Sequence, residues 1–279
     1  MTANLGEPEF FVGVMHVNRD PWLSIAKEGQ IPSWTLDGYK NFEVIYFHGI
    51  SSAISRKMDS LIEDLRWNRG RNASYFISYV LMIVLAPWRN SLPKTFDSNE
   101  KQSGIKVKSL LIKIPEMTAT MRWKKLAFLK YYIKNSRAEF VIITNSSSIL
   151  NFQPIADFVK LHCDVSRPFY AGPIHHGYDG LFVSGSFTVM NRHAAELLVK
   201  ERKKIPVHVM DDIGFGTGFE KLEVVPTDYK SLIIDSEEKL DNYSKEDLLE
   251  SGHFRLKSGS LESRNDAEIA KKLLEKMWS

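Results

Sequence analysis

The sequence has one cysteine, Cys163, among its 279 residues. A single cysteine excludes a disulfide framework within the chain and fits a reducing compartment. The opening residues, MTANLGEPEFF, lack the basic and apolar regions of a secretory signal. From these two absences we expect a cytoplasmic protein.

The sequence also lacks an apolar run long enough to span a bilayer. Its longest candidate, residues 75–88 in LRWNRGRNASYFISYVLMIVLAPWRNSL, is shorter than the roughly 20 residues that a span needs. Arginines and tryptophans flank this run, as they do in helices that lie at a membrane surface. Two interpretations stay open: a buried helix, or a peripheral membrane contact through residues 66–90 on the cytoplasmic face.

Several common catalytic motifs are missing. The sequence contains no P-loop and no HExxH motif, and the glycines at 214, 216 and 218 do not have the G-x-G-x-x-G spacing of a dinucleotide site. Ser184, Gly185 and Ser186 do not follow the G-x-S-x-G order of a nucleophile elbow. These absences argue against a P-loop enzyme, a zinc protease of this type, a Rossmann dehydrogenase and a serine hydrolase.

A strong excess of one charge is absent as well. The net charge is +3, which does not require a nucleic-acid partner. Charge is uneven only at residues 101–137, which contain ten Lys or Arg and a single acidic residue, Glu116. This stretch is either a solvated face or a region that attracts an anionic ligand such as a nucleotide sugar.

Short apolar runs alternate with helical patterns along the chain. We expect strands at residues 10–17, 42–48, 107–114, 140–144, 181–190 and 222–225, which are rich in apolar residues. Little alternation within several of these runs is typical of strands buried on both faces. Strands that alternate with helices predict an α/β fold with a mostly parallel central sheet flanked by helices.

Helical patterns fill the segments between these strands. Residues 119–135 place Trp123, Leu126 and Leu129 on one helical face, and residues 153–163, 192–204 and 263–279 look similar. Ser263 with Asp266, and Ser244 with Asp247, form capping-box patterns. We expect one domain over residues 1–279, with an inserted helical or loop segment at about 66–104, in which 91–104 is loop.

Two polar groups stand out against this frame. The stretch EFVIITNSSSILN begins as an apolar strand and ends in a polar cluster, residues 144–148. Ligands of open α/β sheets bind at the carboxyl ends of strands, which favours a site there. The pair Asp211 and Asp212 follows an apolar run and precedes glycines. The pair is either a helix N-terminus or a general base aimed into a cleft.

The order of these parts resembles the β-1,3-galactosyltransferase and fringe-like glycosyltransferases, which have the GT-A fold. Ser184 and Gly185 with the following aromatic residue, and Asp211-Asp212-Ile213 with Gly216, match two family motifs. Upstream, NFEVIYFHG resembles the second strand of the family, and KIPEMTATMRWKKLAFLKYYI resembles the helix that carries its lysine. The resemblance covers most of residues 8–230 and implies a single Rossmann-like GT-A domain.

The resemblance also implies roles for individual residues. A sugar would move from a nucleoside-diphosphate donor, UDP-linked, to an acceptor hydroxyl of a glycan or glycoconjugate, as in polysaccharide biosynthesis. Asp212, next to Asp211, would be the general base of an inverting displacement. Ser184, Gly185 and Ser186 would line the pocket for donor and acceptor, and Lys124 would stand in the lysine position.

The sequence departs from the family at the acidic triplet that holds a divalent metal. Asn145, Ser146 and Ser147 replace the three carboxylates. Amide and hydroxyl oxygens are poor ligands for Mg²⁺ or Mn²⁺, so only Asn145, Ser147 and His253 remain as weak metal candidates. Either the diphosphate is bound without a tightly held metal, or the protein binds without catalysis.

The C-terminal segment SGHFRLKSGS offers positive charge instead. His253, Arg255 and Lys257 alternate, so in a strand they would share one face. Family members bring a C-terminal histidine to the diphosphate, and Arg255 and Lys257 could neutralise that group directly. The alternative is a basic polar tail.

Three functions therefore remain. The first is an inverting glycosyltransferase that uses a UDP-sugar. The second is an inactive protein on the same fold that binds a sugar nucleotide or a glycan. The third is a sugar transferase that acts on nucleic acid, which only the basic excess at residues 101–137 favours. The sequence leaves the oligomeric state open.

Overall fold

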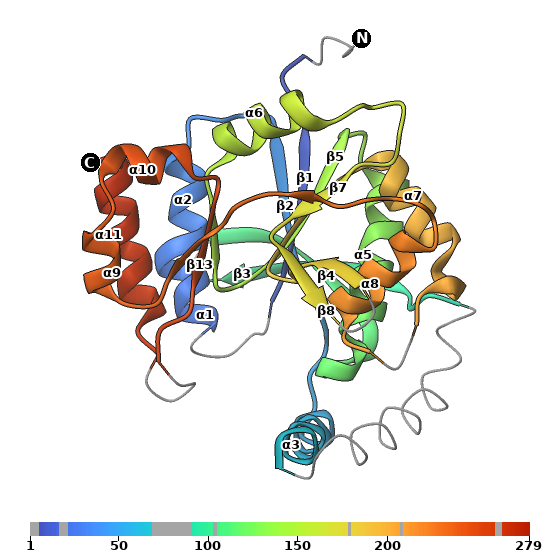
Figure 1. Cartoon of the computed structure of the whole chain (residues 1–279). Coiled ribbons are helices and arrows are strands. Elements are labelled where there is room, and N and C mark those ends of the chain that lie inside the picture. Colours follow the sequence, from blue (N-terminus) through green and yellow to red (C-terminus); the bar gives the residue numbers. More distant parts are fainter. Residues whose placement is uncertain are drawn as a thin grey trace.

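A twisted sheet of eight strands forms the centre of the molecule (Figure 1). The computed structural model describes residues 6–16, 22–68, 91–102, 105–177, 180–206, 209–259 and 264–279. In spatial order the strands are β11 (Thr227–Asp228), β7 (Tyr170–Gly172), β10 (Phe187–Asn191), β5 (Phe140–Asn145), β1 (Phe10–Met15), β2 (Phe42–Ile50), β4 (Ile105–Pro115) and β3 (Thr95–Gln102).

The four central strands β5, β1, β2 and β4 are parallel to one another. Phe10 pairs with Phe42 on one side and with Phe140 on the other, so the three strands begin in register. Their side chains alternate between two cores: Phe10 and Val12 face one, and Phe11 faces the other. Burial on both faces explains the continuous apolar runs, and the expected α/β fold with a mostly parallel central sheet is confirmed.

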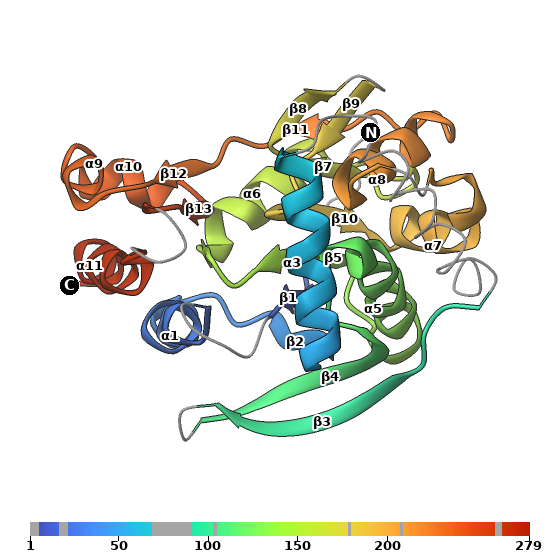
Figure 2. The ribbon, with the colours of Figure 1, turned by 90° about the horizontal axis from the view of Figure 1, so that it is seen from below.

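Helices cover both faces of this sheet (Figure 2). The helices α5 (Met121–Asn135), α7 (Arg192–Lys200) and α8 (Asp211–Glu220) pack on one face through Leu126, Leu198 and Phe219, among others. The helices α6 (Phe152–His162) and α2 (Ile31–Leu36) pack on the other. A short π-helix, η1 (Ala26–Gln30), connects α1 (Trp22–Ile25) to α2.

A third core lies outside the second helical layer, around a small sheet with the order β12 (Leu232–Ile234), β13 (His253–Leu256) and β6 (Ser148–Leu150). The helices α9 (Glu237–Asp241), α10 (Lys245–Glu250) and α11 (Asp266–Trp278) complete it. The capping box predicted at Ser244 and Asp247 is confirmed at the start of α10. Ser263 lies outside the described residues, and the cap residue of α11 is Asn265.

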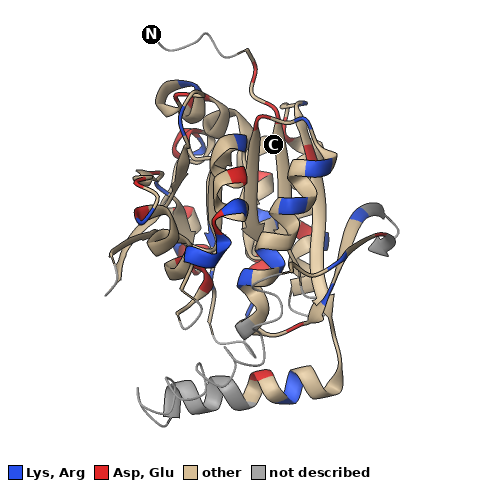
Figure 3. Ribbon diagram, turned by 90° about the vertical axis from the view of Figure 1, so that its right-hand side faces the viewer, with Lys and Arg blue, Asp and Glu red and all other residues tan. Residues whose placement is uncertain are grey.

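The remaining elements are peripheral. The helix α3 (Ala53–Asn68) follows β2 and extends away from the sheet (Figures 1 and 3). A hairpin of β8 (Ile174–Gly177) and β9 (Gly180–Val183) lies beside α8, and two short 3₁₀ turns are η2 (Thr118–Thr120) and η3 (Arg202–Lys204). Within the described residues, no helix is both long and apolar enough to cross a membrane.

Three sequence expectations need correction. Residues 95–102, expected as loop, form β3 and pair along their whole length with β4, because this partner supplies hydrogen bonds that a polar sequence alone does not reveal. The strand expected at 181–190 is two strands, β9 and β10, separated by a turn. Residues 222–225 form no strand and follow the end of α8. Most of the segment 66–104, residues 69–90, lies outside the described residues, and with it the membrane contact expected at 66–90.

Candidate active site

Two turns meet at the edge of the sheet where β1 and β5 end. Met15, the last residue of β1, pairs with Asn145, the last residue of β5. The antiparallel strand β10 begins at the same edge, because Phe187 pairs with Thr144. The turn after β5, residues 145–148, and the turn before β10, residues 184–186, are therefore neighbours, at the edge where open α/β sheets bind ligands.

The side-chain amide of Asn145 organises the 145–148 turn. Its Oδ1 accepts hydrogen bonds from the Ser147 backbone amide at 3.1 Å and from the Ser148 hydroxyl at 3.1 Å. The Arg255 guanidinium donates to the same oxygen. Ser146 is hydrogen-bonded to the imidazole Nδ1 of His16 at 3.2 Å. Asn145, Ser146 and Ser147 thus belong to a neutral, hydrogen-bonded turn.

Gln30, which the sequence analysis missed, supports this turn from the π-helix η1. Its Nε2 donates to the backbone carbonyls of Asn145 and Ser148, both at 2.8 Å. A π-helical turn is an uncommon feature that often occurs at functional sites, and here it places Gln30 beneath the turn. No sequence signal indicates the role of Gln30, because its side chain bonds to residues more than 100 positions away in the sequence.

The 184–186 turn connects the two halves of the site. Thr144 Oγ1 and Ser148 Oγ donate to the Ser186 carbonyl at 2.8 and 3.2 Å. The hydroxyls of Ser184 and Ser186 lie 2.9 Å apart. On the other side, the Gly185 amide donates to Asp212 Oδ2 at 3.3 Å. One turn thus contacts both the polar strand end and the carboxylate pair.

Asp211 and Asp212 are the first residues of α8, so the interpretation as a helix N-terminus is confirmed. Asp212 accepts hydrogen bonds from the backbone amides of Ile213, at 2.9 Å, and Gly185. Burial, and then the charge of Asp211, raise the pKa of Asp212 above its ordinary value. Burial alone would raise the pKa of Asp211 too, but Lys125 and Arg122 hold it below the ordinary value. A partly buried carboxylate with a raised pKa can accept a proton from a bound hydroxyl.

Two cations of α5, which the sequence analysis did not select, contact the start of α8. The Lys125 ammonium lies 2.5 Å from Asp211 Oδ2. The Arg122 guanidinium donates to the carbonyls of Val209 and Met210 at 2.7 and 3.1 Å. The basic excess at residues 101–137 was the only available signal, and it does not separate these two residues from the others.

Lys124, which the sequence analysis did select, has a different partner. Its ammonium is buried and forms an ion pair with Glu116, which also accepts a hydrogen bond from the Gly49 amide. This group lies where β2 and β4 end, next to the edge that holds the two turns. Lys124 is therefore neutralised in place, and it reaches neither Asp211 nor the 145–148 turn.

The three basic residues near the C-terminus are separated. Arg255 pairs with Ser148 across β13 and β6 and reaches Asn145, whereas Lys257 is exposed beyond the end of β13. His253 is fully buried, stacked on Phe187 at 4.7 Å. Its Nδ1 contacts the Ser231 hydroxyl, and burial followed by the charge of Arg255 lowers its pKa to about 3. His253 and Arg255 alternate along β13 and so share one face, but only Arg255 reaches the site.

The site does not fit a divalent metal. Asn145 Oδ1, the best oxygen of the weak candidates, already accepts from a guanidinium, whose charge repels a cation. Ser147 Oγ donates to that same oxygen at 3.3 Å, and His253 lies in the core. Within the described residues, no group of three His, Cys, Asp or Glu side chains could hold a metal ion.

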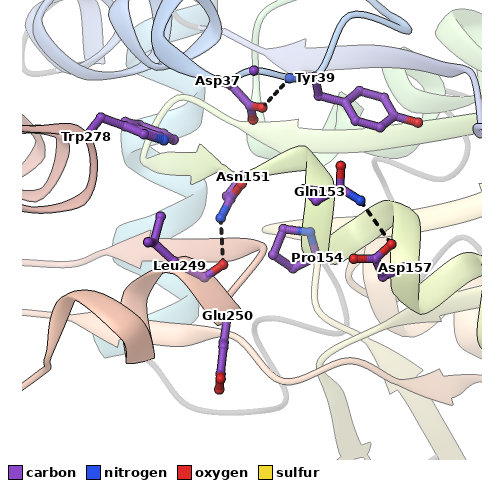
Figure 4. A pocket seen from close by; sticks show the side chains of 10 residues that line it. Asp37, Tyr39, Asn151, Gln153, Pro154, Asp157, Leu249, Glu250 and Trp278 are labelled. Carbon is purple, nitrogen blue, oxygen red and sulfur yellow. Dashed lines mark hydrogen bonds between the residues drawn. The ribbon is translucent and has the colours of Figure 1, made fainter.

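A cavity of about 650 Å³ lies near the opposite edge of the sheet, where β1 and β2 begin (Figure 4). Its lining includes Asp37, Asp157 and Glu250, and the lining residues contain no Lys or Arg. Asp37 accepts from the backbone amides of Tyr39 and Phe152 at 2.9 and 2.8 Å, so its carboxylate is already satisfied. An acidic lining does not suit an anionic nucleotide sugar.

Comparisons with known proteins give a likeness of shape only. No family model matches the chain, and no curated protein matches it in sequence. The galactosyltransferase LgtC, solved with donor and acceptor sugar analogues, aligns over 97% of this chain and 96% of its own, at 9% identity and a TM-score of 0.46. A glycosyltransferase involved in glycosylating the major capsid of PBCV-1 aligns over 95% and 100%, at 10% identity and a TM-score of 0.40.

A third similar structure is the mannosyltransferase PcManGT from Pyrobaculum calidifontis, in complex with GDP-Man and Mn²⁺. It aligns over 82% of this chain and 56% of its own, at 14% identity and a TM-score of 0.42. Likeness at this level does not identify a donor, an acceptor or a reaction for this chain.

Proposed function

We propose that the protein is an inverting glycosyltransferase that moves a sugar from a nucleoside diphosphate, UDP by resemblance, to an acceptor hydroxyl of a glycan. The observation that supports this most is the contact between Asp212 and the 184–186 turn. It places a carboxylate with a raised pKa beside the polar turn after β5, which Arg255 of β13 contacts at Asn145. Asp212 as a base on one side of the 184–186 turn and Arg255 as a cation for the diphosphate on the other suit a single displacement at the anomeric carbon.

In the proposed step, the acceptor oxygen attacks the anomeric carbon while Asp212 takes the hydroxyl proton. The new carbon–oxygen bond forms as the bond to the diphosphate oxygen breaks, and the bond electrons leave with the diphosphate. Attack from the side opposite the leaving group inverts the anomeric centre. Ser184 and Ser186, whose hydroxyls are 2.9 Å apart, offer hydrogen bonds to the sugar.

Arg255 is the group that we expect to meet the leaving diphosphate. Within the described residues, its one side-chain partner is the neutral oxygen of Asn145, whereas its neighbour Arg264 pairs with Asp266. Burial lowers the pKa of Arg255 only to about 10, so it stays charged at neutral pH. Asp266 acts on Arg255 only through space and is itself ion-paired with Arg264, so the guanidinium of Arg255 has charge left for an anionic ligand.

The main alternative is a protein that binds a sugar nucleotide or a glycan without turnover. One observation favours it: both oxygens of Asp212 already accept backbone hydrogen bonds, which could make the carboxylate structural. For nucleic acid, no described contact speaks in favour. Lys124 and Lys125, from the basic stretch, are buried in ion pairs. Figure 3 shows both basic and acidic residues on the side of the molecule that it presents.

The test is Asp212→Asn, assayed for donor hydrolysis and for transfer over a panel of nucleotide sugars and acceptors. We expect turnover to fall on the order of 10²-fold or more, because the base is lost. Calorimetry should show unchanged binding of UDP. Asp157→Asn, an exposed carboxylate of α6, is the control. Unchanged turnover in Asp212→Asn would remove Asp212 from the mechanism, and UDP binding without turnover in the wild type would support the alternative.

A further inference from the structure

Two cationic side chains on one face of α5 contact the start of α8. Arg122 and Lys125 are three residues apart, so they lie about one helical turn from each other on the same face. Arg122 holds the carbonyls that precede α8, and Lys125 holds the carboxylate of its first residue, Asp211. The position of the α8 N-terminus therefore depends on two buried cations of another helix.

Two glycines allow this close approach. A Cβ atom at Gly185 would lie 3.1 Å from the Lys125 ammonium and 3.5 Å from Asp212 Oδ2. A Cβ atom at Gly214 would lie 2.6 Å from the Arg122 guanidinium. Lys125, Asp212 and the 184–186 turn are thus in one tightly packed group, in which a larger side chain would displace a charged neighbour.

The two carboxylates of this group have different partners. Asp211 has the ammonium of Lys125, whereas Asp212 has two backbone amides. Arg122 on α5 attracts both carboxylates, Lys125 also acts on Asp212 through space, and the neutral, buried phenol of Tyr170 on β7 lies near them. The ion pair with Lys125 keeps Asp211 deprotonated. At Asp212, burial and the charge of Asp211 outweigh the two amides and the more distant Lys125, which favour the charged form, so Asp212 is the easier of the two to protonate.

We propose that Lys125 is a positioning residue that anchors Asp211 and so leaves Asp212 as the proton acceptor, a role that rests on the sugar transfer proposed above. Lys125 touches neither donor nor acceptor in this scheme. It acts through Asp211, which fixes the first turn of α8 and thereby the direction of the Asp212 side chain. The adjacent Lys124, which pairs with Glu116, has no such role.

The first test needs no turnover. Carbon-13 NMR of the aspartate carboxyls follows the titration of Asp211 and Asp212 in the wild type and in Lys125→Met. We expect both apparent pKa values of the pair to move up in the variant, because a cation that stabilises the charged forms is removed. Lys124→Met, which removes an equally buried cation one residue away, is the matched control and should leave both signals in place.

The second test follows turnover. In Lys125→Met we expect kcat to fall on the order of 10²-fold through misplacement of the base, with little change in KM. The acid limb of the pH profile should shift to higher pH, in step with the NMR titration. Lys125→Arg keeps the charge and should restore the titration of Asp211 and part of kcat.

Lys125→Met leaves the buried carboxylate of Asp211 unpaired, which destabilises the folded chain. A second variant therefore tests the same role without an unpaired charge. The double variant Lys125→Met/Asp211→Asn removes both partners, and we expect it to fold and bind UDP but to keep the loss of kcat. Full turnover in the double variant, or unchanged titration in Lys125→Met, would overturn the role of Lys125. A failure of Asp212→Asn to lose activity would instead refute the proposed function, so the two failures are distinguishable.

Discussion

The backbone amide of Gly185 donates a hydrogen bond to the carboxylate of Asp212 at 3.3 Å, across 27 residues of sequence. This contact joins the turn before β10 to the first turn of α8. The same turn accepts hydrogen bonds from Thr144 near the end of β5 and from Ser148 at the start of β6. The polar strand end and the carboxylate pair thus belong to one connected site.

Gly185→Ala should reduce activity more than stability. The new Cβ would lie 3.1 Å from the Lys125 ammonium, so the ammonium or the turn must shift, and with it Asp212. We expect kcat to fall by about 10-fold or more, because small displacements of a catalytic group are costly. The free energy of unfolding, from urea titration, should change by roughly 1 kcal/mol or less.

A matched control for this change is Gly38→Ala. No heavy atom lies within 4 Å of a Cβ built at Gly38, so the substitution has space and should leave kcat unchanged. Wild-type turnover in Gly185→Ala would show that the contact between the turn and Asp212 does not matter for the reaction.

Arg255→Gln should weaken the binding of nucleoside diphosphates. A charged hydrogen bond contributes about 1.5–3 kcal/mol, which corresponds to roughly 10- to 100-fold in Kd. Arg255→Lys should recover part of the affinity, because it keeps the charge but loses the planar fork. Calorimetry with UDP measures both, and Arg167→Gln, at an exposed arginine, is the control.

The same titrations test whether the diphosphate needs a metal. Because Arg255 occupies the Asn145 oxygen, we expect EDTA to leave the Kd for UDP unchanged and Mn²⁺ to improve it little. An affinity that disappears in EDTA and returns with Mn²⁺ would contradict this prediction and would restore a metal to the site.

Stability should fall in acid through His253. Burial, and then the charge of Arg255, lower its folded pKa to about 3, while the unfolded value is near 6.5. Between these two pH values, His253 is protonated in the unfolded chain and neutral in the folded chain. The stabilising contribution of neutral His253 is complete above pH about 6.5 and is lost as pH falls towards about 3, by up to about 1.4 kcal/mol per pH unit.

Urea unfolding at pH 7 and pH 5 measures this effect. His253→Phe keeps an aromatic ring against Phe187, and its stability should decline less between the two pH values than that of the wild type. His16, whose pKa burial and His48 lower to about 4, should account for part of the remaining decline. His176→Phe, at an exposed position of β8, is the control, and equal declines in His253→Phe and the wild type would refute the assignment.

Much of the frame could be predicted from the sequence. The runs at Phe10, Phe42 and Phe140 are buried on both faces, so their composition alone indicates parallel central strands. The polar cluster after β5 follows from where an apolar run stops, and a pair of acids before an apolar segment suits a helix start. These features depend on neighbouring residues, and local patterns therefore reveal them.

Only the tertiary structure decided which side chains meet. Successive residues of a helix point about 100° apart, so Lys124 reaches Glu116 while Lys125 reaches Asp211, although both are lysines in one motif. Alternation along β13 placed His253 and Arg255 on one face, yet packing buried the first against Phe187 and left the second at Asn145. The sequence alone determined the central parallel strands, the main helices that pack on them and the polar strand end, but not the edge strand β3, whose polar residues are ordered by pairing with β4. The pairing of charges at the site was decided by contacts between segments far apart in the chain, which no local pattern encodes.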